Sequence, residues 1–259
     1  MTSYEAAILD VDGTIVRGEE LLPNVTDGLS ALDDAGIDRL LFSNNPTRGS
    51  DHYGEKLEPH GIAIDSDSVL TSATVSATYL ATTHPDERVY LVGSERLETI
   101  LADAAVGLTD DPERADVVLG SFDKAFSYSA LWEALRALDD DVPFYGTDPD
   151  ATIPVDGGLI PGTGAILAAM EAVAGREPDA ILGKPSTIAA TAAMDRLEAA
   201  PEQTLVVGDR LNTDIELGNR AGMTTALVRT GVTDQTTLET SPIQPDYVLD
   251  SLADIETLL

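Results

Sequence analysis

The sequence has no cysteine, only three lysines and no long uninterrupted apolar segment. Without cysteine there is no disulfide framework, no thiolate zinc site and no cysteine nucleophile. No apolar run approaches the ~20 residues that a membrane-spanning helix needs, so we expect no membrane partner. The first residues lack a basic stretch before their apolar segment, which argues against a signal peptide. Together these absences predict a cytoplasmic protein.

Positive charge is scarce throughout the chain. Only 15 Lys and Arg residues stand against 46 Asp and Glu, which gives a formal net charge of −31. A surface of this charge repels a phosphate backbone, so we expect no nucleic-acid partner. Such acidity with so little lysine is typical of a halophilic protein, because counterions in concentrated salt screen the self-repulsion. An ordinary acidic protein is the alternative. The hydrophobic content of 43% is sufficient for a packed core.

Short apolar segments alternate with amphipathic ones along the chain. This alternation predicts an α/β, Rossmann-like fold, in which a parallel sheet carries helices on both faces. Strands are expected at 4–11, 38–42, 88–92, 116–119, 142–146, 180–182, 204–207, 224–228 and 247–249. Helices are expected at 23–35, 49–59, 72–82, 95–104, 129–139, 165–174, after Pro185, at 214–221 and from Ser251.

The middle of the chain forms a second unit in this interpretation. We expect a core made of residues 1–83 and 181–259, interrupted by an inserted α/β unit at 84–180. Within the insert, residues 148–164 are rich in Gly and Pro and are expected to be irregular. This stretch is a candidate for a loop that faces the substrate, with a flexible connector as the alternative.

Polar side chains follow four of the expected strands, and the first of these segments carries two carboxylates. Asp10 and Asp12 come directly after the first strand, at a carboxyl end where ligands bind in open parallel sheets. One carboxylate could attack an electrophile while the other gives and takes a proton. A solvated Asp-Gly turn is the structural alternative.

The second and third segments could hold an anion. Ser43 and Asn44 offer a hydroxyl, an amide and backbone N–H groups in a turn, although an ordinary Asn-Pro turn would look the same. Lys184 stands in a Gly-Lys-Pro turn before a helix, and its ammonium could hold a phosphate. The Gly spacing of a P-loop is missing here, and a lysine at a helix start is the alternative.

The fourth segment resembles a site for a divalent cation. Asp209 ends a strand, and Asp214 follows five residues later at an expected helix start. Mg²⁺ takes oxygen ligands and is commonly held by one or two carboxylates together with substrate phosphate oxygens. Asp214 alone could instead be a helix N-cap, or a cap that also orients a ligand.

With these four segments in this order, the sequence resembles the haloacid dehalogenase superfamily over nearly its whole length. Its NagD-like, p-nitrophenylphosphatase branch is indicated by the segments 42–45, 120–123 and 245–247. The resemblance implies that the inserted unit is an α/β cap domain. It also implies a Mg²⁺-dependent phosphatase that hydrolyses small phosphomonoesters through an aspartyl-phosphate. Sugar or nucleotide phosphates would be the metabolites bound, p-nitrophenyl phosphate would be hydrolysed in vitro, and a homodimer is conceivable.

The resemblance also implies roles for individual residues. Asp10 would be the nucleophile, and Asp12 the general acid and then the base. Ser43, the N–H of Asn44 and Lys184 would bind the transferring phosphoryl group. The Mg²⁺ ion would be held by Asp10, by the backbone carbonyl of Asp12 and by Asp209, with Asp214 in support. These roles agree with phosphoryl-transfer chemistry, which depends on positioning and charge neutralisation.

Three other functions remain open at this point. A dehalogenase of the same superfamily normally lacks the second aspartate of the first segment, so Asp12 argues against it. A phosphomutase is poorly separated by sequence alone. A non-catalytic protein that binds a phosphorylated ligand would be expected to lose the nucleophile or a metal ligand, and neither Asp10 nor Asp209 is lost.

Overall fold

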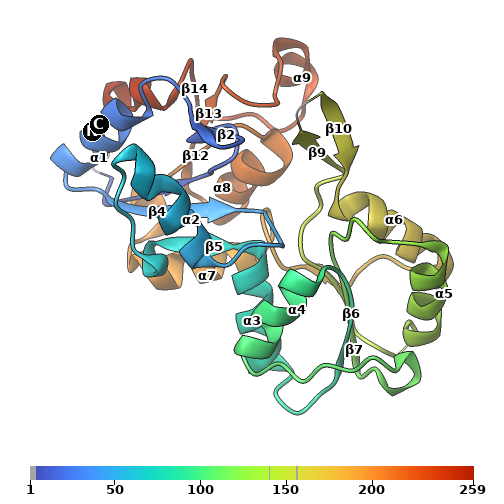
Figure 1. The fold of residues 1–259 in the computed structure, drawn as a ribbon. Coiled ribbons are helices and arrows are strands. Elements are labelled where there is room, and N and C mark those ends of the chain that lie inside the picture. Colours follow the sequence, from blue (N-terminus) through green and yellow to red (C-terminus); the bar gives the residue numbers. More distant parts are fainter. Residues whose placement is uncertain (1–3, 140, 156) are drawn as a thin grey trace. The chain divides into compact units, whose positions relative to one another are not determined.

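A computed structural model describes residues 4–139, 141–155 and 157–259. The chain divides into two compact units (Figure 1). The first contains the chain up to Ser43, together with Ser50–Leu70 and Ala189–Leu259, and the second contains Asn44–Gly49 and Thr71–Ile188. The expected domain boundaries near residues 84 and 180 stay a prediction.

The first unit contains a parallel sheet with its helices. Its elements are β1 (Ala6–Leu9), β2 (Val16–Arg17), β3 (Glu20–Leu21), α1 (Val25–Asp34), β4 (Asp38–Ser43), α2 (Ser50–Leu57), η1 (Glu58–His60), η2 (Ser66–Ser68), β5 (Val69–Thr71), most of α7 (Thr187–Leu197), η4 (Pro201–Gln203), β12 (Thr204–Gly208), η5 (Leu211–Ile215), α8 (Glu216–Ala221), β13 (Thr224–Val228), α9 (Gln235–Thr240), β14 (Tyr247–Leu249) and η6 (Leu252–Leu258).

Strand β1 lies inside a six-stranded sheet whose order is β14-β13-β12-β1-β4-β5. It pairs in parallel with β4 on one side and with β12 on the other, so that Ala6 lies opposite both Asp38 and Thr204. The carboxyl ends of these three strands therefore meet at one edge of the sheet, and the residues after Leu9, Phe42 and Gly208 lie at that edge.

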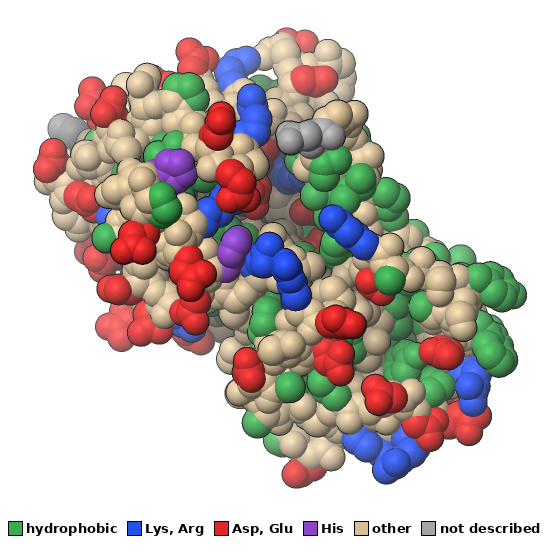
Figure 2. Space-filling view, viewed as in Figure 1, with side chains coloured by type: hydrophobic (Ala, Val, Ile, Leu, Met, Phe, Trp, Pro, Cys, Tyr) green, Lys and Arg blue, Asp and Glu red, His purple; other side chains and the backbone are tan. Residues whose placement is uncertain are grey.

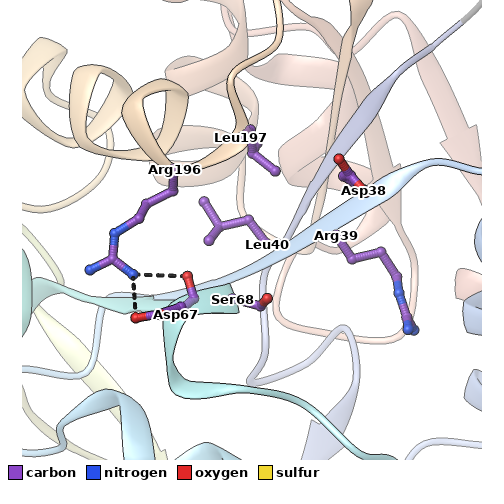
Figure 3. Close-up of a pocket in the computed structure, with 7 residues that line it drawn as sticks. All are labelled: Asp38, Arg39, Leu40, Asp67, Ser68, Arg196 and Leu197. Atoms are coloured by element: carbon purple, nitrogen blue, oxygen red, sulfur yellow. Dashed lines mark hydrogen bonds and ion pairs between the residues drawn. The ribbon is translucent and has the colours of Figure 1, made fainter.

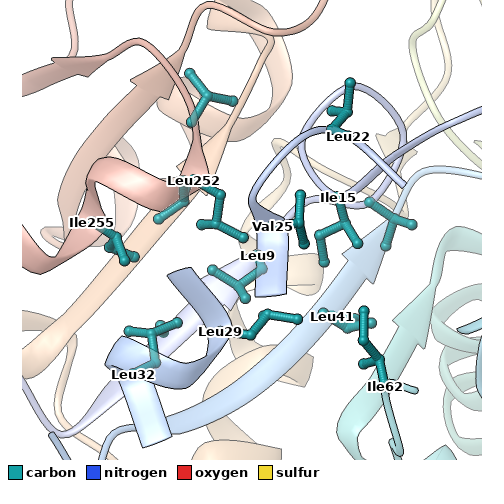
Figure 4. Packing of buried hydrophobic residues seen from close by; sticks show 14 of the residues in the cluster. Leu9, Ile15, Leu22, Val25, Leu29, Leu32, Leu41, Ile62, Leu252 and Ile255 are labelled. Atoms are coloured by element: carbon teal, nitrogen blue, oxygen red, sulfur yellow. The ribbon is translucent and has the colours of Figure 1, made fainter. Parts of the chain in front are cut away.

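Successive side chains of each strand point to opposite faces of this sheet, and both faces are covered by helices. Ala7 and Leu9 point to the face that packs against α1, α2 and η6, where the largest apolar cluster lies (Figure 4). A fully buried leucine side chain contributes roughly 2 kcal/mol relative to an exposed one. On the opposite face, a Cβ at Gly218 of α8 would lie 2.4 Å from the Cγ2 of Thr225, so that α8 packs directly on β13. The prediction of helices on both faces is confirmed.

A polar cavity of about 280 Å³ lies where β4 begins, at the opposite end of that strand from Ser43. Asp38, Arg39, Ser68 and Arg196 are among its lining residues (Figure 3). The guanidinium of Arg196 donates a hydrogen bond of 2.8 Å to the backbone oxygen of Asp67 and lies 3.7 Å from its carboxylate. This cavity lies at the amino edge of the sheet beside the Arg196–Asp67 ion pair and is separate from the carboxylates described below.

The second unit contains a parallel sheet of its own, β11-β8-β7-β6. Its elements are α3 (Ser72–Thr83), β6 (Val89–Val92), α4 (Glu95–Asp103), η3 (Pro112–Arg114), β7 (Val117–Gly120), α5 (Tyr128–Ala137), β8 (Phe144–Gly146), β9 (Thr152–Val155), β10 (Gly158–Pro161), α6 (Thr163–Ala174) and β11 (Ala180–Ile181). Leu119 belongs to the apolar cluster with α3 and α4, and Val118 belongs to the cluster with α5 and α6. This unit therefore also has helices on both faces of its sheet.

The expected irregular segment 148–164 is the main secondary-structure prediction that was wrong. It contains the antiparallel hairpin β9–β10, whose register pairs Ile153 with Ile160. Gly and Pro within it were interpreted as loop signals, but Pro154 and Pro161 lie in a two-stranded ribbon that has free edges. The helix expected at 214–221 begins earlier, as the π-helix η5, and the C-terminal helix η6 is of the 3₁₀ type.

Candidate active site

Three carboxylates of the first unit converge at the carboxyl edge of its sheet. Asp10 follows β1, Asp209 follows β12, and Asp214 lies in η5. One carboxylate oxygen from each lies within 4.8 Å of the other two. The backbone N–H of Asp10 donates to the oxygen of Val207, which fixes the end of β1 beside β12. The structure therefore brings together Asp10, Asp209 and Asp214, and their roles as metal ligands stay a prediction.

Asp209 is fully buried between two glycines. A Cβ at Gly13 would lie 2.6 Å from its Oδ2, and a Cβ at Gly231 would lie 1.8 Å from the same atom. Any side chain at either position would collide with the carboxylate. The backbone N–H of Val232 donates a hydrogen bond of 2.7 Å to Oδ2, and the hydroxyl of Thr233 donates one of 2.6 Å to the backbone oxygen of Asp209. The loop after β13 therefore holds this carboxylate in one orientation.

Asp214 is held by the turn that precedes it. The backbone N–H of Arg210 donates a hydrogen bond of 3.1 Å to its Oδ2, and its own N–H donates to the oxygen of Arg210. A Cβ at Gly208 would lie 2.3 Å from the Cγ of Asp214, so glycine is required there for the carboxylate to approach. Asp214 thus lies inside the π-helix η5 with its side chain turned back onto the end of β12, and it is not the N-cap of a helix that begins there, which was the alternative from the sequence.

The donor set suits a small hard cation. Three carboxylates this close repel one another strongly where solvent is excluded, and Asp209 and Asp214 are only 0% and 1% exposed. A divalent cation removes that repulsion, and all-oxygen ligands are what Mg²⁺ prefers. The side chain of Asp12 does not belong to the carboxylate cluster. From the sequence, only its backbone carbonyl was expected to hold the metal. Its side chain is 50% exposed.

Ser43, the last residue of β4, is 2% exposed, and its Oγ accepts a hydrogen bond of 2.8 Å from the hydroxyl of Tyr53. Tyr53 lies on α2 and is itself 1% exposed. Sequence reasoning missed Tyr53, because a tyrosine at helical spacing reads as a core residue. The signal that could have found it is the hydroxyl, since a buried phenol needs a polar partner.

In the second unit, Asn44 and Lys184 exchange two hydrogen bonds. The side-chain amide of Asn44 donates to the oxygen of Lys184 at 3.0 Å, and the N–H of Lys184 donates to the Oδ1 of Asn44 at 2.9 Å. The hydroxyl of Ser72 donates to the backbone oxygen of Asn44, and Lys184 is 1% exposed. The sequence predicted both residues as phosphate ligands, and the structure brings them together although 140 positions separate them.

A buried carboxyl that the sequence analysis did not single out lies at the base of the hairpin β9–β10. Asp148 is 2% exposed and accepts hydrogen bonds from the hydroxyls of Thr147 and Thr163 at 3.0 and 2.6 Å. The backbone N–H of Asp150 donates to its other oxygen. Burial, and then the nearby carboxylate of Asp150, raise the pKa of Asp148 to about 7. The segment read as a loop therefore has a fixed anchor at its base.

Comparisons with known proteins agree with this geometry. Family models of haloacid dehalogenase-like hydrolases match residues 7–107 and 181–255. An acid sugar phosphatase from Staphylococcus epidermidis is 33% identical, over 97% of this chain and 96% of its own. The structure of a p-nitrophenyl phosphatase from Archaeoglobus fulgidus superposes with a TM-score of 0.93 at 31% identity, covering 99% and 100% of the two chains. NagD from Escherichia coli K-12 gives 0.87 at 27% identity, with 98% of each chain covered.

Among the residues that the structure describes, no helix is both long and apolar enough to cross a membrane. The strand-end carboxylates, the two parallel sheets and the matches over nearly the whole chain lead to one assignment. The chain belongs to the haloacid dehalogenase-like hydrolases, in their NagD-like, p-nitrophenylphosphatase branch, and is a phosphatase.

Proposed function

We propose that this phosphatase hydrolyses small phosphomonoesters with the help of Mg²⁺ and through an aspartyl-phosphate on Asp10. The observation that carries the proposal is the cluster of Asp10, Asp209 and Asp214, whose carboxylate oxygens lie within 4.8 Å of one another. Sugar phosphates and nucleotides are the proposed metabolites, and p-nitrophenyl phosphate is the proposed test substrate. The names of the matched relatives support sugar phosphates and p-nitrophenyl phosphate as substrates.

The chemistry has two steps. In the first, a carboxylate oxygen of Asp10 attacks the phosphorus, the ester P–O bond breaks, and Asp12 gives its proton to the departing oxygen. In the second, water attacks the phosphorus of the aspartyl-phosphate while Asp12 takes a proton from that water. The P–O bond to Asp10 breaks, phosphate leaves, and both carboxylates return to their starting states.

The protein must neutralise charge for a carboxylate to approach a phosphate dianion. Asp10, Asp209 and the backbone carbonyl of Asp12 are the proposed ligands of Mg²⁺, with Asp214 in support. A bound Mg²⁺ supplies electrostatic stabilisation of the negative charge on the transferring group. The hydrogen bonds from Val232 and Thr233 and the close approach of Gly13 and Gly231 keep Asp209 in one orientation, which supports this role.

Ser43, Asn44 and Lys184 are the proposed phosphate ligands. The hydroxyl of Ser43 accepts a hydrogen bond from Tyr53, and because a hydroxyl can donate as well as accept, we propose that it donates to a phosphate oxygen. The side chain of Asn44 bonds to the backbone of Lys184, and the backbone N–H of Asn44 is the group that we propose for the substrate. Lys184 would supply the positive charge that offsets the phosphate and the nucleophile.

The test compares wild type with Asp10→Asn on p-nitrophenyl phosphate in molar KCl, with and without Mg²⁺. Asp34→Asn, on the exposed end of α1, is the matched control for loss of one carboxylate. We expect Mg²⁺-dependent turnover in wild type and control and none in Asp10→Asn. Mass spectrometry of the acid-quenched enzyme should find phosphate on the peptide that contains Asp10. Equal activity of the folded Asp10→Asn variant would refute the nucleophile.

Cellular placement and working conditions are also proposed. The face seen in Figure 2 carries many acidic side chains, which supports activity in concentrated salt. Cytoplasmic placement and a homodimer stay proposals of the sequence. Measuring the activity and the unfolding temperature across a KCl series tests the salt proposal, because a salt-adapted chain of this charge gains stability as the salt rises.

A further inference from the structure

Lys56 lies beside the proposed general acid. It is in the last turn of α2, and only 9% of its side chain is exposed. Its Nζ is 4.0 Å from the Oδ1 of Asp12 and 4.0 Å from the Oε1 of Glu19. One ammonium therefore lies between two carboxylates, one of which is assigned to proton transfer. The position is notable in a chain that has three lysines in all.

The packing of helix α2 against the core sets the position of the Lys56 side chain. Tyr53 and Leu57, three residues before it and one after, are buried in the core, so that Lys56 lies on the inner edge of the helix. One turn further, the Nε2 of His60 lies 3.2 Å from the backbone oxygen of Glu19. The same side of α2 and η1 thus contacts the β2–β3 turn twice, through a side chain and through the backbone.

The backbone of Asp12 is held firmly, whereas its carboxyl group is not enclosed. A bridge joins Asp12 to Val16, and the N–H of Gly13 donates to the oxygen of Val16 at 2.8 Å. The side chain of Asp12 is nevertheless 50% exposed. Among the residues that the structure describes, Lys56 is the cation in contact with it. The direction of the carboxyl group is therefore set mainly by this charge contact.

Stability does not account for the arrangement. A half-exposed ion pair at this distance contributes little to folding, because water screens it. Orientation is a different matter, since a proton donor that is displaced by about 1 Å loses much of its effect on rate. A charge that favours one direction of a half-exposed carboxyl group affects the reaction rather than the stability of the fold.

We propose that Lys56 is a positioning residue, which holds the Asp12 carboxyl in the direction from which it passes a proton to the leaving oxygen. The inference rests on the proposed function, in which Asp12 is the general acid. In this scheme Lys56 acts through the carboxyl group of Asp12, and it touches neither the substrate nor Asp10 and Asp209, which together with the backbone carbonyl of Asp12 are the proposed ligands of Mg²⁺. The carboxylate of Glu19 also lies 4.0 Å from the Lys56 ammonium, which places the ammonium beside the β2–β3 turn.

The leaving group provides the test. An alkyl alcohol leaves poorly as an anion and needs the proton, whereas p-nitrophenolate leaves readily without one. The ratio of kcat/KM for an alkyl monoester, glycerol 3-phosphate, to that for p-nitrophenyl phosphate therefore reports the delivery of the proton. Because kcat/KM extends only to the first irreversible step, hydrolysis of the aspartyl-phosphate does not enter the ratio.

We expect Lys56→Met to lower this ratio about tenfold, a part of the 10²–10⁴-fold that general acid catalysis contributes. Lys56→Arg keeps the charge and should keep the ratio within about threefold, and Lys124→Met in the second unit should not change it. In an Asp12→Asn background, Lys56→Met should lower the ratio no further, because the acid is already gone.

The outcomes separate the two proposals. If wild type hydrolyses neither ester with Mg²⁺ present, the proposed function fails. If wild type is active and folded Lys56→Met loses activity on both esters alike, Lys56 is structural and the inference is overturned. Unchanged kinetics in Lys56→Met overturn it as well. Lys56→Gln is the second variant should Lys56→Met fold poorly, with circular dichroism and the unfolding temperature as the check.

Discussion

The hydroxyl of Tyr53 donates a hydrogen bond of 2.8 Å to the hydroxyl oxygen of Ser43, and both side chains are buried. The bond holds the side chain of Ser43, which is one of the proposed phosphate ligands, against α2. Substitution of Tyr53 by Phe removes the donor and leaves the ring in the core.

Tyr53→Phe should therefore raise KM for p-nitrophenyl phosphate by roughly three- to tenfold, with a smaller effect on kcat. Loss of one buried hydrogen bond should also lower the free energy of unfolding by about 1 kcal/mol. Steady-state kinetics and urea unfolding measure the two effects. Kinetics identical to wild type would mean that Ser43 needs no orientation, and Tyr79→Phe in the second unit is the matched control.

Removal of a carboxylate from the cluster should change the response to metal. Asp209→Asn keeps an acceptor for the N–H of Val232 but relieves repulsion with Asp10 and Asp214. Without metal, the variant should be at least as stable as wild type. Addition of Mg²⁺ should raise the unfolding temperature of wild type only, since a ligand stabilises the state that binds it. Scanning calorimetry in buffers with EDTA and with Mg²⁺ measures this, and an equal rise in both proteins would contradict the metal assignment.

The glycines around Asp209 give a steric test of the same site. A Cβ at Gly231 would lie 1.8 Å from Oδ2 of Asp209, so Gly231→Ala must displace the carboxylate or its loop. We expect at least a tenfold loss of Mg²⁺-dependent activity, together with weaker metal binding in isothermal titration. Gly49→Ala is the control, because no atom lies within 4 Å of a Cβ there. Full activity of Gly231→Ala would show that Asp209 tolerates movement.

Asp148 predicts a pH dependence of stability in the second unit. Its pKa is raised from 3.8 to about 7, chiefly by burial and then by Asp150. The folded state therefore favours the protonated form, and this stabilisation is complete below the unfolded pKa and is lost as the pH rises through the folded pKa. Relative to Asp148→Asn, wild type should lose stability on the order of a few kcal/mol between pH 4 and pH 8. Urea unfolding at several pH values would contradict this if both proteins changed in parallel.

The sequence was most informative where residue type and strand end coincide. Asp10 and Asp209 were each singled out because they stand at an expected strand end, and the resemblance to the haloacid dehalogenase superfamily implied that they hold one ion; parallel strands bring such ends together. The strand expected at 224–228 has those bounds in the structure. The fold class follows from the same alternation of strands and helices.

Other features depend on contacts that a local pattern does not contain. Tyr53 and Lys56 look like ordinary residues of an amphipathic helix, and their roles appear only when α2 is packed beside β4 and the β2–β3 turn. Asp148 reads as a loop residue because its partner Thr163 is 15 positions away. The hairpin β9–β10 was missed because its glycines and prolines are turn formers in most contexts.

The order of strands in the first unit has a consequence for synthesis of the chain. Strand β1, which leads into Asp10, needs β4 on one side and β12 on the other, and β12 begins only at Thr204. A nascent chain that has emerged as far as η4 holds Asp10, the proposed nucleophile, next to a strand with one unpaired backbone edge, which can pair with wrong partners. Asp209 and Asp214 are made later still. The three clustered carboxylates that we propose as a Mg²⁺ site and the second partner of β1 are therefore completed in the same late event, when the last part of the chain leaves the ribosome.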